Sequence, residues 1–501
     1  MAWIKPLSAE TADDRTVLGG KAHGLVVLRR LGLPVPPGFV ITTGACRAFL
    51  RDGRPPDGLT AELAAAVRDL EAVTGRRLGG RERPLVVSVR SGASVSMPGM
   101  MSTILNLGLT TAATAGLAAE TGDERFAVAS RRRLLSALTG PVPDDVARQL
   151  EHAIAAVFSS WDTPRARIYR ELHGIPHDLG TAVIVQAMVF GNRDGRSGTG
   201  VAFSRDPNTG ERVPYGEVLF GAQGDDVVSG RSMTRPLTDL ADREPAVWAD
   251  LLRAMAGIER HYRDACQVEF TFESGGLWLL QVRPGGLVGR AAIRVAVDLA
   301  DERVIERHEA LLRVSPRHVH HARTPRIETA GARLDILTRG VGAVPGVATG
   351  RVATTAERAV RMAAGGPVIL VRPETSPADL YGLTASAGVV TARGGPASHA
   401  AVVARAMGRP AVVGAADLTI DAAGSLRVAG RTVPDGALIT IDGTGGEVVA
   451  GSAPVSTAPA DDHLRRLLAW ADDVSGGSGE SADEGAGRLA AARAVLLGGR
   501  P

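Results

Sequence analysis

One histidine in this sequence lies where its position suggests chemistry. The run from Thr391 to Gly408 has the pattern of a strand end, a Gly-Gly turn and a helix of small and β-branched residues. Ser398 takes the N-cap position and His399 the first helical turn, where backbone N–H groups lack intrahelical partners. The positive end of a helix favours an anion, such as a phosphoryl group on the imidazole, and disfavours the imidazolium. The pattern predicts a neutral, nucleophilic histidine; simple packing at a helix start is the alternative.

Basic residues in the first part of the chain could hold a polyphosphate. Lys21 follows a Gly-Gly pair, and Lys5 is the only other lysine in the chain, so an ammonium at this turn suggests a phosphate contact. Arg90 ends a β-branched strand beside the Gly- and Met-rich loop 96–102, whose N–H groups can form an anion nest. The Gly-Gly-Lys run is not a P-loop, because alanine follows the lysine. Each of these signals is weak by itself.

Two later strand segments carry oxygen ligands. Glu269 and Gln281 lie on adjacent predicted strands, and ligands of this kind suit Mg²⁺ that bridges phosphates. Arg283 comes two residues after Gln281 and therefore points to the same face of its strand. An ordinary solvated surface is the alternative for each residue taken singly.

The region around the histidine resembles a known domain. The stretch from Val371-Arg-Pro-Glu-Thr-Ser-Pro-Ala-Asp to Met407-Gly is similar to the phosphohistidine domain of the pyruvate phosphate dikinase and phosphoenolpyruvate synthase family. In that family a histidine on a swivelling domain takes a phosphoryl group from ATP and carries it to a second site. His399 matches this carrier histidine. Ala397 stands where many relatives have a regulatory threonine, so control by phosphorylation is not expected there.

The N-terminal half resembles the ATP-grasp domain of the same family. Matching runs include Gly19-Gly-Lys-Ala-His-Gly-Leu, Val87-Ser-Val-Arg-Ser-Gly-Ala and Ser96-Met-Pro-Gly-Met-Met. The resemblance implies ATP and Mg²⁺ as ligands and catalytic roles for His399, Arg283 and Arg90. The residues that it assigns to nucleotide binding are Lys21, Arg90, Gly99, Met100, Met101, Gln186, Met188, Thr199, Glu217, Gln267, Glu269 and Gln281. Among these, it implies metal binding by Glu269 and Gln281 and a position near the adenine for Gln186 and Met188.

Three features depart from the family pattern. Gln267 stands two residues before Glu269, where the family has an aspartate, and a neutral amide weakens the electrostatic hold on metal and phosphate. The helical segment 111–175 is shorter than in the family's full-length enzymes. The chain ends at Pro501, too early for the family's pyruvate-binding barrel, which needs ~200 residues or more. The phosphoryl acceptor, pyruvate or another small molecule, is therefore expected on a separate domain or protein.

Composition excludes several classes of protein. The length of 501 residues suggests about three domains, and a net charge of +3 gives no argument for a nucleic-acid partner. The two cysteines, Cys46 and Cys266, imply no disulfide framework and fit a reducing cytoplasm. No apolar run reaches the ~20 residues of a membrane span, and the first residues do not form a signal peptide.

The predicted fold class is a multidomain α/β and α+β protein, with an ATP-grasp nucleotide-binding domain followed by a swivelling phosphohistidine α/β domain. The expected parts are an ATP-grasp N-terminal lobe at 1–110, a helical segment at 111–175, an ATP-grasp C-terminal lobe at 176–285, a helical connector at 286–335, the phosphohistidine domain at 336–452 and a flexible tail at 453–501, a remnant of the connector to the barrel.

The expected activity is ATP-dependent phosphotransfer. ATP phosphorylates His399 with its β-phosphoryl group, AMP leaves, and the histidine carries the phosphoryl group to the acceptor. One alternative is a small-molecule or antibiotic phosphotransferase of the rifampin phosphotransferase type, although no extra acceptor-binding domain is visible. Another is a catalytically degenerate nucleotide-binding homologue. The presence of Lys21, Arg90 and His399 together favours the enzyme, because decayed sites lose such residues first.

Overall fold

The structure is a computed structural model. It describes residues 2–95, 97, 100–138, 140, 142–228, 234–287, 289–322, 324–328, 334–421, 424–428, 430–457, 461–476 and 485–498. The chain forms two compact units: unit 1 comprises Met1–Thr199, Phe220–Gln223 and Val268–Val282, and unit 2 comprises Gly200–Leu219, Gly224–Gln267 and Arg283–Pro501. Among the described residues, no helix combines the length and the apolar character that crossing a membrane requires.

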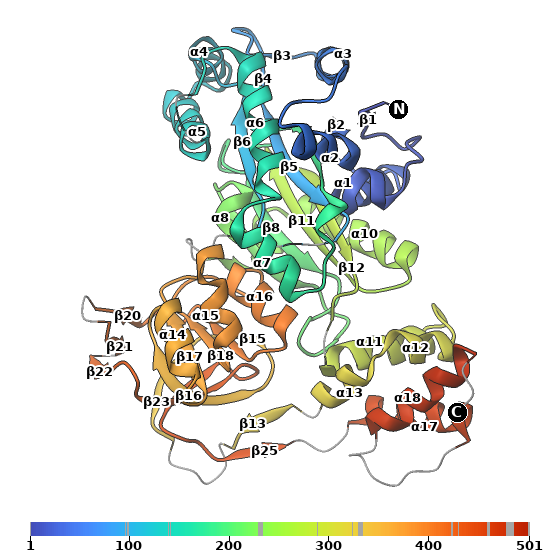
Figure 1. The fold of residues 1–501 in the computed structure, drawn as a ribbon, viewed down its shortest axis with the longest axis vertical. Helices are drawn as coiled ribbons and strands as arrows, with labels where there is room; N and C mark the ends of the chain where they lie inside the picture. The colour runs from blue at the N-terminus through green and yellow to red at the C-terminus, as the bar shows by residue number, and fades with distance from the viewer. Residues whose placement is uncertain are drawn as a thin grey trace. The chain divides into compact units, whose positions relative to one another are not determined.

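Unit 1 contains an antiparallel five-stranded sheet of order β1–β2–β7–β5–β6 (Figure 1). Its strands are β1 (Ile4–Pro6), β2 (Gly38–Ile41), β5 (Val87–Ala93), β6 (Thr103–Leu107) and β7 (Thr181–Ala187). The Val- and Ile-rich β7 is almost entirely buried, as its β-branched residues favour. Ser88 lies opposite Gln186 in the register of β5 and β7. Arg90 and Gln186 are therefore diagonal neighbours on one face, within reach of each other's long side chains.

Helices cover this sheet. They are α1 (Arg15–Arg30), α2 (Thr43–Asp52), α3 (Leu59–Thr74), α4 (Thr111–Thr121), α5 (Glu124–Ala137), α6 (Val146–Ser160) and α7 (Pro164–Leu172), with the short strands β3 (Arg77–Leu78) and β4 (Pro84–Leu85) following α3. Helices α4 to α7 occupy the segment where the sequence predicts helices. The side chains of Thr110, Asp123 and Asp145 accept backbone N–H groups at the starts of α4, α5 and α6. The apolar faces of α2, α3 and α6 pack with β5 and β7 into one core.

A glycine allows α1 to approach the sheet closely. Gly19 interrupts the helix with a φ of 74° and a ψ of 158°, a conformation that side chains disfavour. A Cβ atom at this position would lie 1.6 Å from the carbonyl oxygen of Gly92 at the end of β5. Gly92 in turn lies beside the Cβ atom of Lys21, since a Cβ on Gly92 would be 3.5 Å from it. The Gly-Gly pair therefore brings Lys21 to the strand that carries Arg90.

A second five-stranded sheet has the order β10–β9–β8–β11–β12. Its strands are β8 (Gly198–Phe203), β9 (Tyr215–Phe220), β10 (Arg235–Pro236), β11 (Cys266–Glu273) and β12 (Gly276–Pro284), and the helices of this region are α8 (Gly224–Val228), α9 (Asp239–Arg243) and α10 (Pro245–Tyr262). In β12 the side chains of Leu277, Leu279 and Gln281 share one buried face. Gln281 thus occupies a position that a core residue would normally fill.

Unit 2 contains an eight-stranded sheet of order β14–β24–β23–β16–β17–β18–β19–β15. Its strands are β14 (Ile336–Arg339), β15 (Val341–Val344), β16 (Val347–Ala353), β17 (Val368–Arg372), β18 (Gly388–Thr391), β19 (Ala411–Val413), β23 (Leu438–Asp442) and β24 (Glu447–Ala450). Strands β16 to β19 are parallel neighbours, so their carboxyl ends meet at one edge of the sheet. The chain leaving β17 and the chain leaving β18 therefore reach the same edge.

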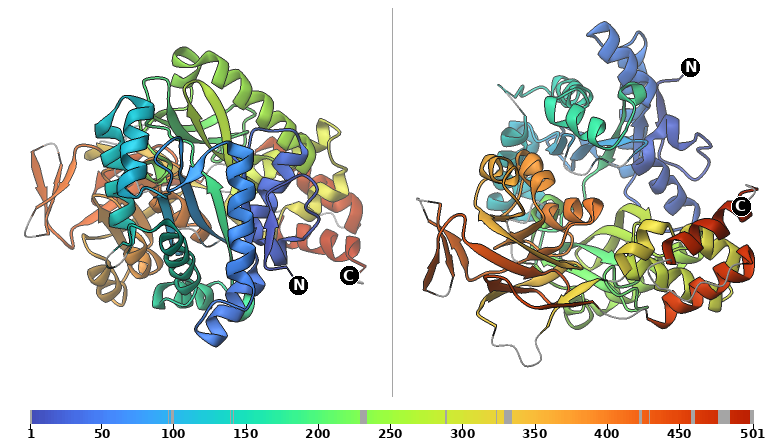
Figure 2. Two further views of the ribbon diagram at one scale, coloured as in Figure 1. Left: turned by 90° about the horizontal axis from the view of Figure 1, so that it is seen from above. Right: turned by 60° about the horizontal axis from the view of Figure 1, so that its bottom comes forward.

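Helical segments connect the parallel strands β16, β17, β18 and β19. They include α14 (Ala356–Ala363), α15 (Leu380–Ala385) and α16 (His399–Met407). A small antiparallel sheet of β20 (Leu418–Ile420), β21 (Leu426–Val428) and β22 (Arg431–Val433) projects from the eight-stranded sheet in both views of Figure 2.

The sequence predicts a flexible tail at 453–501, and the residues that the structure describes in this range include a strand and two helices. The described helices α17 (Asp462–Ser475) and α18 (Gly485–Leu496) pack with α11 (Gly289–Asp301), α12 (Arg307–Arg313) and α13 (Pro316–Ala322) around one apolar core. Leu464, Leu467 and Trp470 recur at helical spacing on α17 and are buried. Strand β25 (Val455–Thr457) pairs with β13 (Pro325–Ile327). The sequence predicts a flexible segment here because the run after α17 is rich in Gly and Ser, although α17 itself has an amphipathic pattern.

Replacing Gly19 tests the close approach of α1. Gly19→Ala should lower the free energy of unfolding by about 3 kcal/mol, because strain of ~1 kcal/mol in a conformation that essentially only glycine adopts is added to overpacking of ~2 kcal/mol. Gly32→Ala is the matched control, since Gly32 has a similar φ of +70° and nothing within 4 Å of a Cβ atom. Its cost should stay at ~1 kcal/mol. Denaturant titration measures both values, and equal costs would contradict the close approach.

Candidate active site

His399 is the first residue of α16. Ser398 takes the N-cap position with extended φ and ψ, as the sequence predicts, although its hydroxyl makes no capping hydrogen bond. The imidazole is largely buried, with 9% of the residue exposed. Burial lowers the pKa of His399 to about 4, against a smaller opposing effect of the Asp379 charge. The ring is therefore neutral at pH 7 and can act as a nucleophile.

The two nitrogens of this ring have different surroundings. Thr375 Oγ1 lies 3.1 Å from Nδ1 of His399, within hydrogen-bond distance. Nε2 is buried and has no hydrogen-bond partner within the described part of the chain. When Nδ1 carries the proton and donates it to Thr375, the lone pair of the neutral ring is on Nε2. The geometry therefore leaves Nε2 as the nitrogen available to an electrophile.

Thr375 is held by the turn in which it lies. The next residue, Ser376, forms a capping box with Asp379, and the Asp379 carboxylate also lies 3.1 Å from Nε of Arg372. Sequence reasoning gave Thr375 no role, although it lies within the run that carries the family resemblance. Thr375 and His399 are 24 residues apart, and only the parallel pairing of β17 and β18 brings them together.

Glu217 lies against the loop that precedes His399. Its carboxylate accepts a hydrogen bond from the backbone N–H of Ala397 at 3.4 Å, and a Cβ atom on Gly395 would overlap it at 1.4 Å. Burial raises the pKa of Glu217 to about 7, and the hydrogen bond from Ala397 and the charge of Arg405 act in the other direction. Arg405 itself donates to the carbonyl oxygen of Pro396. Both residues therefore fix this loop, and sequence reasoning missed Arg405.

Arg90 of unit 1 is a buried cation with spare donor capacity. One of its terminal nitrogens, Nη2, donates to Gln186 Oε1 at 2.5 Å and approaches the Leu280 carbonyl oxygen at 3.5 Å. Gln186 in turn donates to the carbonyl oxygen of Pro36. Burial lowers the pKa of Arg90, and the nearby charge of Glu269 raises it. Nε of Arg90 is buried without a hydrogen-bond partner among the residues described.

The same unit contains an unpaired acceptor. Oε1 of Gln281 is buried and accepts no hydrogen bond from the described residues, and the residue is 4% exposed. An unsatisfied buried amide oxygen is costly unless a ligand completes it. Gln281 and Glu269 supply oxygen donors, and Mg²⁺ usually takes few protein ligands together with substrate phosphates. These residues therefore fit Mg²⁺ bound to a polyphosphate, with the spare Arg90 donor suited to an anionic oxygen.

The other predicted residues of unit 1 differ in how accessible they are. Met100 is fully buried and Met101 half-buried. The backbone N–H of Met188 donates to the Val86 carbonyl oxygen. The Thr199 hydroxyl is buried, donates to the Phe270 carbonyl oxygen at 3.0 Å and accepts from Thr271, so its hydrogen-bonding capacity is spent within the protein. Gly99 lies outside the described residues.

Gln267 and Arg283 belong to unit 2, as His399 does. Both are half-buried, Gln267 on β11 and Arg283 on β12. The sequence thus predicts residues that the structure groups into two sets. One set lies in unit 1 with Arg90, and the other, which includes Glu217, Gln267 and Arg283, lies in unit 2 with His399.

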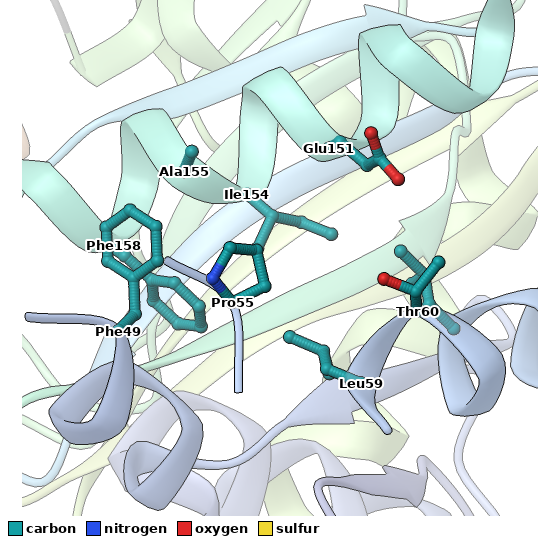
Figure 3. Close-up of a pocket in the computed structure, with 9 residues that line it drawn as sticks. Phe49, Pro55, Leu59, Thr60, Glu151, Ile154, Ala155 and Phe158 are labelled. Carbon is teal, nitrogen blue, oxygen red and sulfur yellow. The ribbon is translucent and has the colours of Figure 1, made fainter. Parts of the chain in front are cut away.

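A pocket elsewhere in unit 1 has a different character (Figure 3). It lies between α2, α3 and α6, and its walls are mostly apolar. The lining residues are Phe49, Pro55, Leu59, Thr60, Leu63, Glu151, Ile154, Ala155 and Phe158. None of the candidate site residues is among them, so this pocket does not mark the candidate active site.

Two family models match the chain. Residues 55–238 match the pyruvate phosphate dikinase AMP/ATP-binding domain, and residues 365–446 match the mobile domain of PEP-utilising enzymes. The first range contains Arg90 and Gln186, and the second contains Thr375 and His399. The predicted fold class is confirmed: a mixed α/β and α+β chain with an ATP-binding domain followed by a phosphohistidine-type mobile domain.

Curated relatives agree with these models. The chain is 41% identical to pyruvate, phosphate dikinase of Rhizobium meliloti (strain 1021) over 528 residues, which cover 92% of this chain and 59% of the relative. It is 40% identical to pyruvate, phosphate dikinase 2 of Zea mays (94% and 59% covered) and 37% identical to pyruvate, phosphate dikinase of Clostridium symbiosum (94% and 60% covered). The chain belongs to the pyruvate phosphate dikinase family and spans about three fifths of the length of these relatives.

The low pKa of His399 predicts how stability depends on pH. An unfolded histidine has a pKa of about 6.5, so between about pH 6.5 and pH 4 the unfolded chain binds more protons than the folded chain. The contribution of His399 therefore lowers the free energy of unfolding as the pH falls through this window. His399→Gln removes that contribution and should give a flatter dependence. Denaturant titrations of both chains between pH 7.5 and 4.5 measure it, and identical slopes would contradict the buried, neutral ring.

Proposed function

We propose that this chain transfers a phosphoryl group from ATP to Nε2 of His399. The observation that carries the proposal is the buried, neutral imidazole, whose Nδ1 lies within hydrogen-bond distance of Thr375 and whose Nε2 has no partner within the described part of the chain. Such a ring is a nucleophile without needing a separate general base. The AMP/ATP-binding domain supports ATP as the donor.

The residues of unit 1 would hold the nucleotide. Arg90 would donate from Nε to a phosphate oxygen, and Lys21 would add a point charge. Gln281 and Glu269 would hold Mg²⁺, which offsets the negative charge of the phosphates. Gln267 adds no negative charge to this site, so we expect weaker metal binding than an aspartate would give.

Arg283, Gln186, Met188 and the loop around Met101 would also contribute. We propose that Arg283 stabilises charge during transfer and that Met101 contacts phosphate through its backbone. Gln186 would act mainly through Arg90, because its amide accepts from Arg90 and donates to Pro36.

The proposed step breaks one bond and forms one. Nε2 of His399 bonds to the β-phosphorus, the bond from that phosphorus to the oxygen of the α-phosphate breaks, and AMP leaves. Nε2 then carries a pyrophosphoryl group. In a second step the bond between the bridging oxygen and the γ-phosphorus breaks as the γ-phosphoryl group passes to inorganic phosphate or water, which leaves a single phosphoryl group on Nε2. The mobile domain would carry the remaining group to an acceptor, and the relatives' name makes pyruvate the first candidate. A cytoplasmic location is part of the proposal, supported by the free, buried Cys46 and Cys266.

Labelled ATP tests the transfer. The chain is incubated with Mg²⁺ and with ATP labelled at the β or the γ position, and AMP release and acid-labile label on the protein are followed. We expect β-label on the unaltered chain and none on His399→Ala. His308→Ala is the matched control, because His308 is exposed on α12, and it should label normally. Label on His399→Ala would overturn the proposal, and ATP binding without any label would favour a catalytically degenerate homologue.

A further inference from the structure

The loop that follows β5 is held by the corner between α6 and α7. The backbone N–H of Ser102 donates to the hydroxyl of Ser160, the last residue of α6, at 3.1 Å. Nε of Arg165, in the first turn of α7, donates to the carbonyl oxygen of Met100 at 3.2 Å. Two side chains of the helical segment therefore hold two successive peptide groups, Met100–Met101 and Met101–Ser102, just before β6.

The corner that makes these contacts is itself rigid. The Ser160 hydroxyl donates to the Val157 carbonyl oxygen at 2.6 Å, which fixes its orientation. Arg170 is fully buried, stacks 4.3 Å from the Trp161 ring and donates to the Trp161 carbonyl oxygen at 2.5 Å. The Trp161 indole donates to the carbonyl oxygen of His177. A cation stacked and hydrogen-bonded inside the protein tolerates little movement.

The contact from Arg165 determines which way a neighbouring N–H points. The C=O of Met100 and the N–H of Met101 belong to one trans peptide plane, and they point in opposite directions. Because Arg165 binds that carbonyl, the N–H of Met101 is directed away from α7. The side chain of Met100 is fully buried, and its packing holds the Met100 end of the same peptide group. The corner therefore orients a backbone donor in the part of the chain where an anion nest is expected.

We propose that Arg165 and Ser160 are positioning residues for nucleotide binding: they hold the peptide groups Met100–Met101 and Met101–Ser102 so that the N–H of Met101 faces the phosphates of ATP. This inference rests on the proposed function, because it takes the loop to be a phosphate contact. Neither residue touches the nucleotide in this account. Their loss should weaken ATP binding and leave the chemistry at saturating ATP unchanged.

The chain offers a matched control on the same helix. Arg167 lies two residues after Arg165 on α7, is 55% exposed and pairs with Asp162. That ion pair lies within the helical segment and involves no loop residue. Arg167→Ala removes the same charge and the same number of atoms as Arg165→Ala, so a difference between the two variants reports the loop contact.

The experiment uses the full chain in two backgrounds. In the His399→Ala background, calorimetry gives the dissociation constant of ATP without turnover. We expect a five- to twentyfold increase for Arg165→Ala and for Ser160→Ala, and less than a twofold change for Arg167→Ala. In the unaltered background, the KM for ATP should rise by a similar factor while the rate of His399 phosphorylation at saturating ATP stays within twofold. Arg165→Lys, which keeps a donor, should recover part of the loss.

Hydrogen exchange provides a readout that needs no nucleotide. The amide of Ser102 should exchange faster in Ser160→Ala than in Arg167→Ala. Equal ATP affinity in Arg165→Ala, Ser160→Ala and the unaltered chain would overturn the inference while the proposed function stands. A fall in the rate at saturating ATP with an unchanged KM would overturn it as well. Failure of the starting chain to bind ATP would instead contradict the proposed function, and this inference with it.

Discussion

The proposed phosphoryl transfer depends on the contact between Thr375 and Nδ1 of His399. An imidazole at a helix start can present either nitrogen, and it can be neutral or charged. The threonine occupies one nitrogen, and burial keeps the ring neutral by lowering its pKa to about 4. Nε2 is then the nitrogen left for a phosphorus atom. The parallel strands β17 and β18 are needed for this contact, because they bring the two chain segments to one edge of the sheet.

The candidate site residues of each unit retain polar atoms that a stable core would not. Gln281 Oε1, Arg90 Nε and His399 Nε2 are all buried without hydrogen-bond partners in the described part of the chain. Each such unpaired atom lowers the free energy of unfolding by about 1–3 kcal/mol. A polyphosphate with Mg²⁺ would satisfy the first two atoms, and a phosphoryl group would bond to the third. A binding site that is formed before its ligand binds commonly contains unpaired polar groups, and these groups lower the stability of the free protein.

The sequence predicted those parts of the site that depend on neighbouring residues. The helix start at His399, the helical segment at 111–175 and the closeness of Arg90 to a Gly-rich loop all follow from local patterns. Thr375, Arg405 and Arg165 could not be found in this way, because their partners lie far away in the chain or are backbone carbonyl groups that carry no sequence signal. The packing of α17 and α18 was not expected within the predicted tail at 453–501, because the Gly- and Ser-rich run outweighed the buried leucines of α17.

The most direct test of the proposed role of Nε2 is to identify the atom of His399 that accepts the phosphoryl group. The chain is phosphorylated with ATP and Mg²⁺, and phosphorus and nitrogen NMR at alkaline pH identifies the ring nitrogen that carries phosphorus. We expect attachment to Nε2 of His399, because Thr375 lies against Nδ1. Attachment to Nδ1, or to any other residue, would contradict it.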